Sequence, residues 1–421
     1  MNEVLLKLEH LKVGKQLLRK LKNEVKNRVL LRISQKIIKN ITLILNANQL
    51  DVDSYRKSKD FNEAYVDRLI LNEKRIAEIC KSLELVAEMN DPVGQVVEER
   101  VLENGLLVRR MKSPLGVIFI IFESRPNVIT EAFSLAFKAG NALILKGGKE
   151  SLETSRVIYR CIEESLAEEN LNSELIFWGL LESKRDVTDF MMKQNKFIDV
   201  LIPRGGEKLI EHVINQSRIP IIKNDRGLCH IYVHEKANLE MTLEIIENAK
   251  TQRPSVCNSA ETLLIDLAVA NTFLPIICKV LEKKRVDFFV CEKAKKILSS
   301  FLTVQSVSEK SYDTEYLDLK LNIRVVENFE MALSHIEKYG SRHSESIITD
   351  DQEAAKNFQL LVDAAVVYWN ASTRFTDGGQ LGLGAEIGIS TQKLHVRGPV
   401  GLDALTSLQW IIDGQGQIRK S

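Results

Sequence analysis

Apolar residues recur at intervals of three and four along the first 90 residues, and charged residues occupy the opposite faces. The pattern is clearest in KNRVLLRISQKIIKNITLILNANQLD and in RLILNEKRIAEICKSLELVAEM. This spacing is typical of amphipathic helices that bury one face. We therefore expect a helical N-terminal region that closes at the turn-forming residues 91–94 (DPVG).

From residue 115 the pattern changes to short apolar runs that alternate with helical segments. LGVIFIIF predicts a buried strand, ITEAFSLAFKAG a helix, NALILK a second strand and residues 151–169 a second helix. This alternation is typical of an α/β fold with mostly parallel sheets. After about Lys250 it begins again, so two α/β domains are expected. The further expected strands are ELIFWGL, FIDVLIPRG, IPIIK, ETLLID, DFFV, LNIRVV, SESIIT and AAVVYWN.

Two segments outside the α/β pattern predict a small β element. Asn104 and Gly105 stand between the apolar runs of QVVEERVLENGLLVRRMK, and Asn-Gly in that position is a strong hairpin signal. The segment LTSLQWIIDGQGQIRK, near the end of the sequence, predicts a terminal strand.

Composition narrows the class of protein. A chain of 421 residues is too long for a single core, and a formal net charge of +1 without a basic stripe argues against nucleic acid as a partner. The longest apolar run, residues 115–122, is far too short to span a bilayer, and the N-terminus lacks a signal-peptide core. We therefore expect a cytoplasmic protein with no membrane partner.

The cysteines offer one candidate nucleophile. None of the six forms a CxxC pair or a Cys/His cluster with zinc-site spacing, so no metal is expected. Cys257 lies in a loop between an expected helix and an expected strand, close to Arg253, where a thiolate is favoured. Cys80, Cys161 and Cys278 lie on expected helix faces, where packing is the ordinary role. From this local context alone, Cys257 is either a nucleophile or a small buried residue.

Three motifs follow expected strands, at the edge where open parallel sheets bind ligands. In ESRPN, Arg125 offers a partner for a carboxylate or phosphate, and Asn127 offers an amide for an oxyanion. KGGK and PRGG combine glycines with cations, which suits a phosphate, although neither matches the GxGxxG fingerprint. The residues of these two motifs are Lys146, Gly147, Gly148, Lys149, Arg204, Gly205 and Gly206. Taken singly, each motif is also consistent with an ordinary turn.

Taken together, these segments resemble the γ-glutamyl phosphate reductase family of the aldehyde dehydrogenase superfamily. The matching segments occur in the family's order, and their co-occurrence is far more specific than any one of them. They are NANQLD, DPVGQV, PLGVIFIIFESRPNV, ALILKGGKES, FIDVLIPRGG, AKTQRPSVCNSAETLL, HIEKYGSRHSESIIT and NASTRFTDGGQLGLGAEIGISTQKLHVRGPVGL. The resemblance implies reduction of γ-glutamyl phosphate by NADPH to glutamate-5-semialdehyde and phosphate, the second step of proline synthesis from glutamate.

The resemblance also implies the superfamily's three-part architecture. Residues 1–94 and 113–250 would form the nicotinamide cofactor domain, and residues 381–397 would return to it. Residues 251–380 would form the catalytic domain with the thiol. An oligomerisation hairpin and terminal strand would come from residues 95–112 and 398–421, so a homo-oligomer is expected.

Individual roles follow from the same resemblance. The family's QRP-x-VCN motif makes Cys257 the nucleophile, and the superfamily's oxyanion-stabilising amide falls on Asn127. Lys146 matches the lysine that holds the adenosine ribose. Many NAD-using relatives have an acidic residue three positions later, where this chain has Lys149, and this cation favours the 2′-phosphate of NADPH. The candidates for binding the substrate are Arg125, Arg253, Ser372, Thr373 and Arg374, of which Arg253 also suits the thiolate or the phosphate.

The sequence departs from the pattern of its apparent relatives in three places. Ser255 replaces a usual glycine, which would alter the loop, and Trp369 replaces a smaller residue. Hydrolytic aldehyde dehydrogenases carry a water-activating glutamate in the segment that corresponds to residues 223–229, where this chain has none and Asp225 is a weak substitute. A thioester would therefore be reduced rather than hydrolysed. Glu386 and His395 are expected to be structural.

Two alternative functions remain open. A CoA-acylating aldehyde dehydrogenase would share the thiol, but NASTRFTDGG argues for the glutamate-specific family. A non-catalytic paralogue would have no need to keep Cys257, Asn127 and Lys146 together. No kinase domain is evident, so we expect a separate glutamate 5-kinase to supply the labile acyl phosphate, which favours a direct encounter between the two proteins.

Overall fold

The chain folds into two compact units, each of which is described here by itself. The computed structural model describes residues 1–58, 61, 63–123, 125–181, 185–223, 226–300 and 302–419. Unit 1 comprises Met1–Lys223, Gly382–Gly388 and Val400–Ser421, and unit 2 comprises Asn224–Leu381 and Ile389–Pro399. Both units are built on parallel sheets with helices, so the predicted α/β fold class is confirmed.

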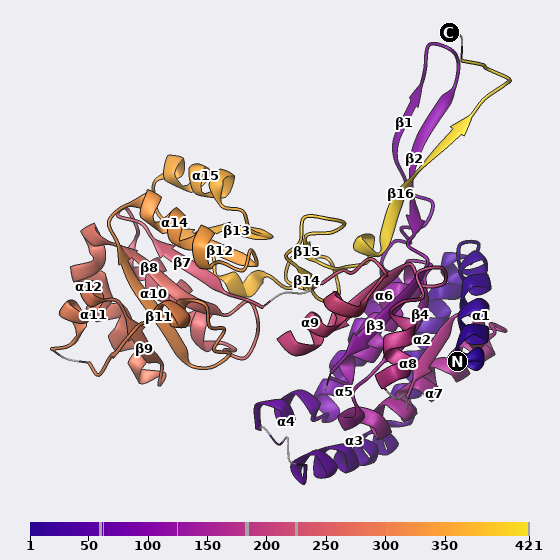
Figure 1. The fold of residues 1–421 in the computed structure, drawn as a ribbon, viewed down its shortest axis with the longest axis horizontal. Coiled ribbons are helices and arrows are strands. Elements are labelled where there is room, and N and C mark those ends of the chain that lie inside the picture. The colour runs from indigo at the N-terminus through magenta and orange to yellow at the C-terminus, as the bar shows by residue number, and fades with distance from the viewer. Residues whose placement is uncertain are drawn as a thin grey trace. The chain divides into compact units, whose positions relative to one another are not determined.

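The centre of unit 1 is a four-stranded parallel sheet in the order β5-β4-β3-β6. All six residues of β3 are buried, as expected for a strand of a parallel sheet that is covered on both faces. Helices α1 and α6 both contact β3 and β4, and α2 and α5 pack against α6 (Figure 1). The strands are β3 (Val117–Phe122), β4 (Ala142–Lys146), β5 (Phe177–Leu180) and β6 (Val200–Arg204).

The helices of unit 1 follow the predicted amphipathic pattern. They are α1 (Asn2–Leu18), α2 (Asn23–Lys39), α3 (Ile41–Arg56), α4 (Glu63–Leu69), α5 (Glu73–Glu88), α6 (Asn127–Lys138), α7 (Leu152–Glu168), α8 (Arg185–Met191) and α9 (Glu207–Gln216), with 3₁₀ turns at Lys149–Ser151, Ser173–Leu175 and Asp403–Leu405. The strand expected at IPIIK is reduced to one bridge between Ile221 and Leu201, because β6 is the edge strand of the sheet and pairs there only briefly.

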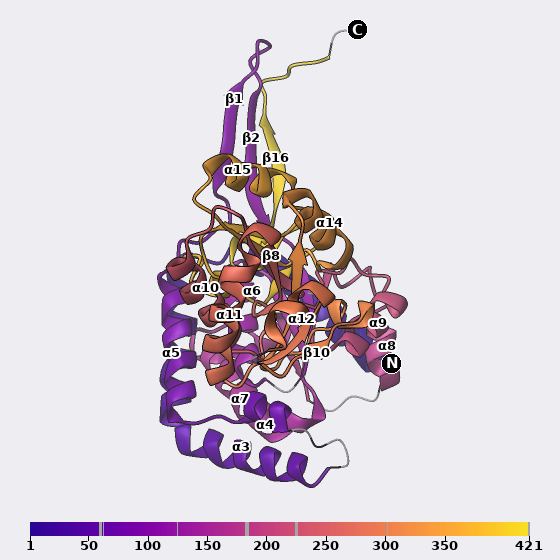
Figure 2. The ribbon, with the colours of Figure 1, turned by 90° about the vertical axis from the view of Figure 1, so that its left-hand side faces the viewer.

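A three-stranded antiparallel sheet extends from the rest of unit 1, as Figure 1 shows and Figure 2 shows from the side. It contains β1 (Val96–Val101), β2 (Leu107–Pro114) and β16 (Thr406–Asp413), in the order β1-β2-β16. Gly105, with φ of 83°, makes the turn of the predicted hairpin. The hairpin and the terminal strand are therefore confirmed as structure, whereas their role in oligomerisation stays a prediction.

Unit 2 contains a seven-stranded parallel sheet in the order β10-β9-β11-β8-β7-β12-β13. Its strands are β7 (Cys229–Val233), β8 (Ala260–Asp266), β9 (Asp287–Val290), β10 (Gln305–Ser306), β11 (Lys320–Val326), β12 (Ser344–Ile348) and β13 (Val366–Trp369), and β14 (Ile389–Ser390) pairs separately with β15 (Gly398–Pro399). Its helices are α10 (Leu239–Thr251), α11 (Leu267–Lys283), α12 (Glu292–Leu298), α13 (Glu309–Tyr312), α14 (Phe329–Tyr339) and α15 (Gln352–Leu361), with a 3₁₀ turn at Thr373–Phe375.

The boundary between the two compact units lies between residues 223 and 224, earlier in the sequence than the boundary expected near Lys250. The reason is the pairing of β7 with β8, which assigns β7 and the following helix α10 to the sheet of unit 2. The loop that carries Cys257 therefore lies inside unit 2, between α10 and β8, and not at its start.

Candidate active site

Three of the predicted ligand motifs meet at one edge of the sheet of unit 1. Strand β3 lies between β4 and β6, and its residues Ile121 and Phe122 pair with Lys146 and Arg204 respectively. Because the strands are parallel, their carboxyl ends lie side by side. ESRPN, KGGK and PRGG, which are far apart in the sequence, are thereby brought together.

Side chains lie close to two of the glycines at this edge. A Cβ atom on Gly147 would lie 3.0 Å from Cζ of Phe122, and one on Gly205 would lie 2.4 Å from Oε2 of Glu123. The backbone N–H of Gly206, at the start of α9, donates to the same oxygen over 2.8 Å. A carboxylate thus already accepts a hydrogen bond at the N-terminus of α9, where backbone N–H groups favour anions. Glu123 is a site residue that sequence analysis missed, although it follows β3 directly.

The cations of the sheet edge differ in their surroundings. Lys146 is half-buried, and its Nζ donates to the carbonyl oxygen of Gly147 over 2.8 Å. Burial lowers the pKa of Lys146, and the nearby carboxylate of Glu150 opposes that shift. Lys149 is exposed, and Arg204 is half-buried with its guanidinium against Gly388, where a Cβ atom would lie 2.5 Å from Nη1. The ammonium of Lys149, three positions after Lys146, is therefore exposed to solvent.

Asn127 is the first residue of α6 and is half-buried. Its Nδ2 donates to Oε1 of Glu131, one helical turn later, over 2.8 Å. An amide nitrogen carries two hydrogens, so this bond engages only one of them. Arg125, also half-buried, lies in the turn before α6, where its carbonyl accepts from the N–H of Val128.

Cys257 is less buried than four of the five other cysteines. Cys80, Cys161, Cys229 and Cys278 are buried, and burial raises the pKa of each thiol, to about 11 for Cys161 and about 12 for Cys278. A thiol with a raised pKa is a poor source of thiolate. Cys257 and Cys291 are half-buried. Cys291 directly precedes α12, and its sulfur accepts from the backbone N–H of Val325 in β11.

The backbone beneath the Cys257 thiol is held from two sides. The carbonyl oxygen of Cys257 accepts a hydrogen bond from Sγ of Cys229 over 3.2 Å. Gly227 packs against the same carbonyl so closely that a Cβ atom there would lie 1.7 Å from the oxygen. Neither neighbour was singled out from sequence, because each is about 30 positions away and carries no motif of its own.

Asn258 connects the thiol loop to the predicted substrate loop. Its Nδ2 donates to the carbonyl oxygen of Thr376 over 2.8 Å, its Oδ1 accepts from Nη1 of Arg374, and its carbonyl oxygen accepts from Oγ1 of Thr373 over 2.7 Å. Arg374 also donates from Nε to Oε1 of Gln252 over 2.9 Å. Arg374 and Thr373 therefore both contact Asn258, the residue beside the thiol. The hydroxyl of Thr373 is engaged in this contact.

The remaining predicted residues of unit 2 lie in the same neighbourhood. Ser372 is buried and caps the 3₁₀ turn by accepting from the N–H of Arg374, whereas Arg253 is exposed. Burial, followed by the like charge of Arg253, lowers the pKa of Arg374. Two guanidinium groups that repel each other create a place for an anion.

The departures from the family pattern are accommodated without strain. The φ angle of Ser255 is not positive, so this residue does not need the conformational freedom of glycine. The indole of Trp369 donates to the carbonyl oxygen of Thr349 over 2.9 Å. Asp225, the weak substitute for a general base, lies outside the described residues.

Comparison with known proteins assigns the family. The sequence model of the aldehyde dehydrogenase family matches residues 15–289. A γ-glutamyl phosphate reductase of Carboxydothermus hydrogenoformans is 46% identical over all of both chains, and one of Nautilia profundicola is 44% identical over 95% of this chain and 96% of its own. The crystal structure of γ-glutamyl phosphate reductase from Thermotoga maritima superposes with a TM-score of 0.95 at 42% identity, covering 99% of this chain and 100% of that one. The chain belongs to the γ-glutamyl phosphate reductase family.

Membership in this family of oxidoreductases implies a nicotinamide cofactor. The edge of the unit 1 sheet fits such a group, because glycines open the backbone of two adjacent loops and Lys146, Lys149 and Arg204 supply cations for phosphates. In the described part of the chain, no cluster of three or more His, Cys, Asp and Glu side chains is placed to hold a metal ion. Of the helices within those residues, none has the length and apolar character needed to cross a membrane.

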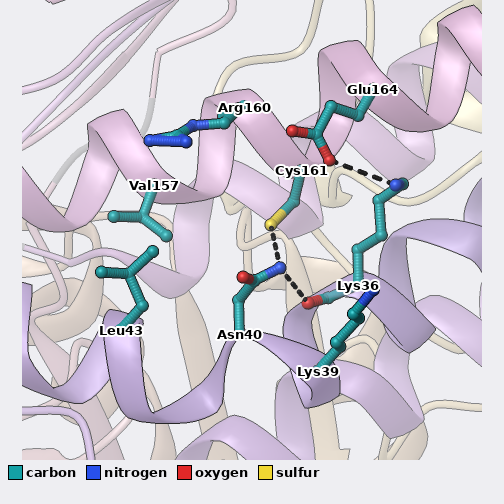
Figure 3. Close-up of a pocket in the computed structure, with 8 residues that line it drawn as sticks. All are labelled: Lys36, Lys39, Asn40, Leu43, Val157, Arg160, Cys161 and Glu164. Atoms are coloured by element: carbon teal, nitrogen blue, oxygen red, sulfur yellow. Dashed lines mark hydrogen bonds and ion pairs between the residues drawn. The ribbon is translucent and has the colours of Figure 1, made fainter.

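A surface hollow of about 140 Å³ in unit 1 contains none of the predicted site residues. Figure 3 shows it between α2 and α7, with the Cys161 thiol facing the amide of Asn40. Lys36 at its rim pairs with Glu164 and Glu168 over 3.1 and 2.7 Å. Because the pKa of Cys161 is raised and the nearest ammonium is already paired, this hollow does not supply a nucleophile.

Proposed function

We propose that the protein reduces γ-glutamyl phosphate to glutamate-5-semialdehyde and phosphate with NADPH, through a thioester on Cys257, in the second step of proline synthesis from glutamate. The observation that carries this proposal is the packing of the thiol loop against the Ser372–Thr376 loop. Asn258, next to the thiol, joins the two loops through four hydrogen bonds. A nucleophile and a group of anion-binding side chains are thereby held together.

The reaction follows from the chemistry of a thiolate. Cys257 attacks the γ-acyl carbon, so that a C–S bond forms and the C–O bond to phosphate breaks. When bound, the reduced nicotinamide supplies a hydride for the carbonyl carbon of the thioester. The Asn127 amide and the backbone N–H of Cys257 hold the negative charge that develops on oxygen. The C–S bond then breaks, which returns the thiolate and releases the aldehyde.

Guanidinium groups position the substrate. Arg374, fixed by Gln252 and Asn258, retains donors beyond those two bonds and suits the α-carboxylate. The exposed Arg253 lies closer in sequence to the thiol and suits the phosphate that leaves. Arg125, Ser372 and Thr373 complete the proposed binding set, although the Thr373 hydroxyl acts through Asn258.

An assay of the reverse reaction tests this function. With glutamate-5-semialdehyde and inorganic phosphate, the protein should reduce NADP⁺ faster than NAD⁺, and the rate should depend on phosphate. Coenzyme A should not replace phosphate, because the proposed site binds a small anion at arginine. Equal rates with coenzyme A would favour a CoA-acylating enzyme, and no turnover with either would favour a non-catalytic binding protein.

Lys149 is proposed to select NADPH over NADH. Exchanging this exposed lysine in the variant Lys149→Glu should weaken NADPH binding by about 10- to 100-fold, since one charge-assisted contact to the 2′-phosphate contributes about 1.5–3 kcal/mol. NADH, which lacks that phosphate, should bind almost as before. Fluorescence titration of both cofactors measures the effect. The variant Lys39→Glu, at another exposed lysine of unit 1, is the control, and a parallel loss of both cofactors would contradict the assignment.

Lys146 should give cofactor binding a distinctive pH dependence. Its pKa in the folded protein is lowered by burial, so its ammonium loses its charge at a lower pH than an ordinary lysine. The charged form, present below that pKa, attracts the phosphates, and NADPH affinity should therefore fall as the pH rises through the alkaline range. In the variant Lys146→Arg the guanidinium stays charged, and the fall should be absent. Equal slopes for both proteins in NADPH titrations between about pH 7 and pH 10 would exclude Lys146 as the titrating group.

The proposal includes the surroundings of the enzyme. A reducing compartment keeps a thiol nucleophile free, which fits the cytoplasm. A separate glutamate 5-kinase supplies the acyl phosphate, and the lability of that phosphate favours direct transfer between the two proteins. The sheet of β1, β2 and β16 is the proposed oligomerisation surface of a homo-oligomer, and its exposed side chains include Leu408, Trp410 and Ile412.

A further inference from the structure

Two oppositely charged side chains are completely buried beside the thiol loop. Lys250, in the last turn of α10, is 0% exposed, and Glu261, the second residue of β8, is 1% exposed. The Lys250 ammonium lies 3.2 Å from Oε2 of Glu261 and donates to the carbonyl oxygen of Ala260 over 2.9 Å. Both residues lie in the segment AKTQRPSVCNSAETLL, but neither has a role in the proposed mechanism.

The contacts of Lys250 join the two ends of the loop that carries Cys257. The loop leaves α10 at Thr251, and β8 begins at Ala260. One ammonium therefore connects the last turn of α10 to the first two residues of β8. Ser259 provides a parallel connection, because its hydroxyl donates to the carbonyl oxygen of Ala249 over 3.2 Å. The loop is closed at its base by side chains, and not only by the continuity of the chain.

Glu261 extends this connection to the support under the thiol. Its Oε1 accepts from the backbone N–H of Leu317 over 3.3 Å. Two residues earlier, Oε1 of Glu315 accepts from the N–H of Gly227 over 2.8 Å. Gly227 is the residue that packs against the carbonyl oxygen of Cys257. The segment from Glu315 to Leu317 thus touches both the buried pair and the backbone beneath the nucleophile.

Stability alone does not account for a buried ion pair in this place. Removing two charges from water costs about as much as their attraction returns, and well-packed apolar residues often stabilise a fold as well or better. Charge-assisted hydrogen bonds are, however, short and directional, so they fix the relative position of the segments that they join. A loop that presents a nucleophile benefits from such a constraint, because a displacement of about 1 Å can cost about 100-fold in rate.

We propose that Lys250 and Glu261 are positioning residues that hold the two ends of the thiol loop and thereby fix the orientation of Cys257. This inference rests on the proposed role of Cys257 as the nucleophile. The pair does not touch the substrate or the cofactor. It acts through Ala260, Leu317 and the loop that it closes.

Burial also explains why the two residues depend on each other. It raises the pKa of the Glu261 carboxyl to about 7 and lowers the pKa of the Lys250 ammonium, and in each case the partner opposes the shift. The partners that face the pair include Asp318, whose charge favours the ammonium, and Glu315, whose charge disfavours the carboxylate. Replacement of one member alone removes the group that keeps the other charged.

Two variants test the positioning role. Glu261→Gln keeps the shape of the side chain and removes the charge, and the double variant Lys250→Met with Glu261→Leu replaces the pair by apolar residues. Each should lower kcat by about 10- to 100-fold, since the thiol is misoriented, while the KM for the semialdehyde and the affinity for NADPH stay within about twofold. The variant Lys284→Met is the matched control. Lys284 lies at the surface and pairs over 2.9 Å with Glu247 of α10, the helix that also carries Lys250.

The quantity to compare between proteins is the turnover rate divided by the concentration of reactive Cys257 thiols, and not by the concentration of chains. Titration with iodoacetamide, with the modified residues located by mass spectrometry, counts as folded the molecules in which Cys257 is modified while the buried Cys229 and Cys278 are not. If the pair only stabilised the fold, the variants would show fewer such molecules and a lower Tm, but each remaining one would turn over normally. Wild-type kcat per titrated thiol in both variants would therefore overturn the proposal. Retained turnover in Cys257→Ala would instead overturn the proposed function itself.

Discussion

Replacing Cys257 with alanine should lower turnover by about 10,000-fold or more, because loss of a covalent nucleophile removes the whole thioester route. The variant should still bind NADPH normally, since the proposed cofactor residues lie in unit 1 and Cys257 lies in unit 2. The measurement is phosphate-dependent reduction of NADP⁺ by glutamate-5-semialdehyde, together with a fluorescence titration of NADPH.

The structure provides a matched control for this variant. Cys291 is also half-buried and also lies in unit 2, but its sulfur accepts a backbone hydrogen bond at the start of α12. Cys291→Ala should therefore leave turnover within about twofold of wild type, as expected for a substitution away from the reacting atoms. A Cys257→Ala protein that works at a near wild-type rate would rule out the thioester mechanism.

The second large effect is expected at Asn127. Asn127→Ala should lower kcat by about 100- to 1,000-fold, the usual consequence of removing one donor to a developing oxyanion. The loss should appear in kcat and not in NADPH affinity, because the charge on oxygen develops only during the reaction. Steady-state kinetics of the semialdehyde reaction, with a parallel cofactor titration, measures both quantities.

Asn127 also makes a structural bond, and the experiment must separate the two roles. Its Nδ2 donates to Oε1 of Glu131 within α6, so its removal also affects the first turn of that helix. A Tm lowered by a few degrees with normal kcat would show a purely structural role. The variant Asn195→Ala, at an exposed asparagine of unit 1, should change neither quantity.

Two elements of unit 1 could be predicted because their signals are local. The run VIFIIF is apolar throughout, as a strand covered on both faces must be, and all six of its residues are buried. The hairpin around Asn104 and Gly105 follows from turn chemistry, and Gly105 adopts a positive φ. IPIIK carried the same apolar signal but forms one bridge only, because strand pairing depends on a neighbour that the local sequence does not specify.

The use of individual donors could not be predicted, because it depends on contacts across long stretches of sequence. Asn258 and Arg374 are 116 positions apart, yet one accepts from the other. The hydroxyl of Thr373, expected to bind substrate, donates to the carbonyl oxygen of Asn258. Glu123 was passed over although it stands in the ESRPN motif, since only the pairing of β3 with β6 brings Gly206 to its carboxylate.

The sequence by itself determined the family and the α/β fold class, because periodicity and short motifs are properties of neighbouring residues. It singled out Cys257 as one thiol among six. Only the tertiary structure decided what holds that thiol: the Cys229 sulfur and Gly227 beneath its carbonyl, Asn258 beside it, and the buried pair of Lys250 and Glu261 at the base of its loop. The local sequence does not show that Lys250 and Glu261 are buried as a pair, since a charged residue can be buried only where the fold supplies its partner.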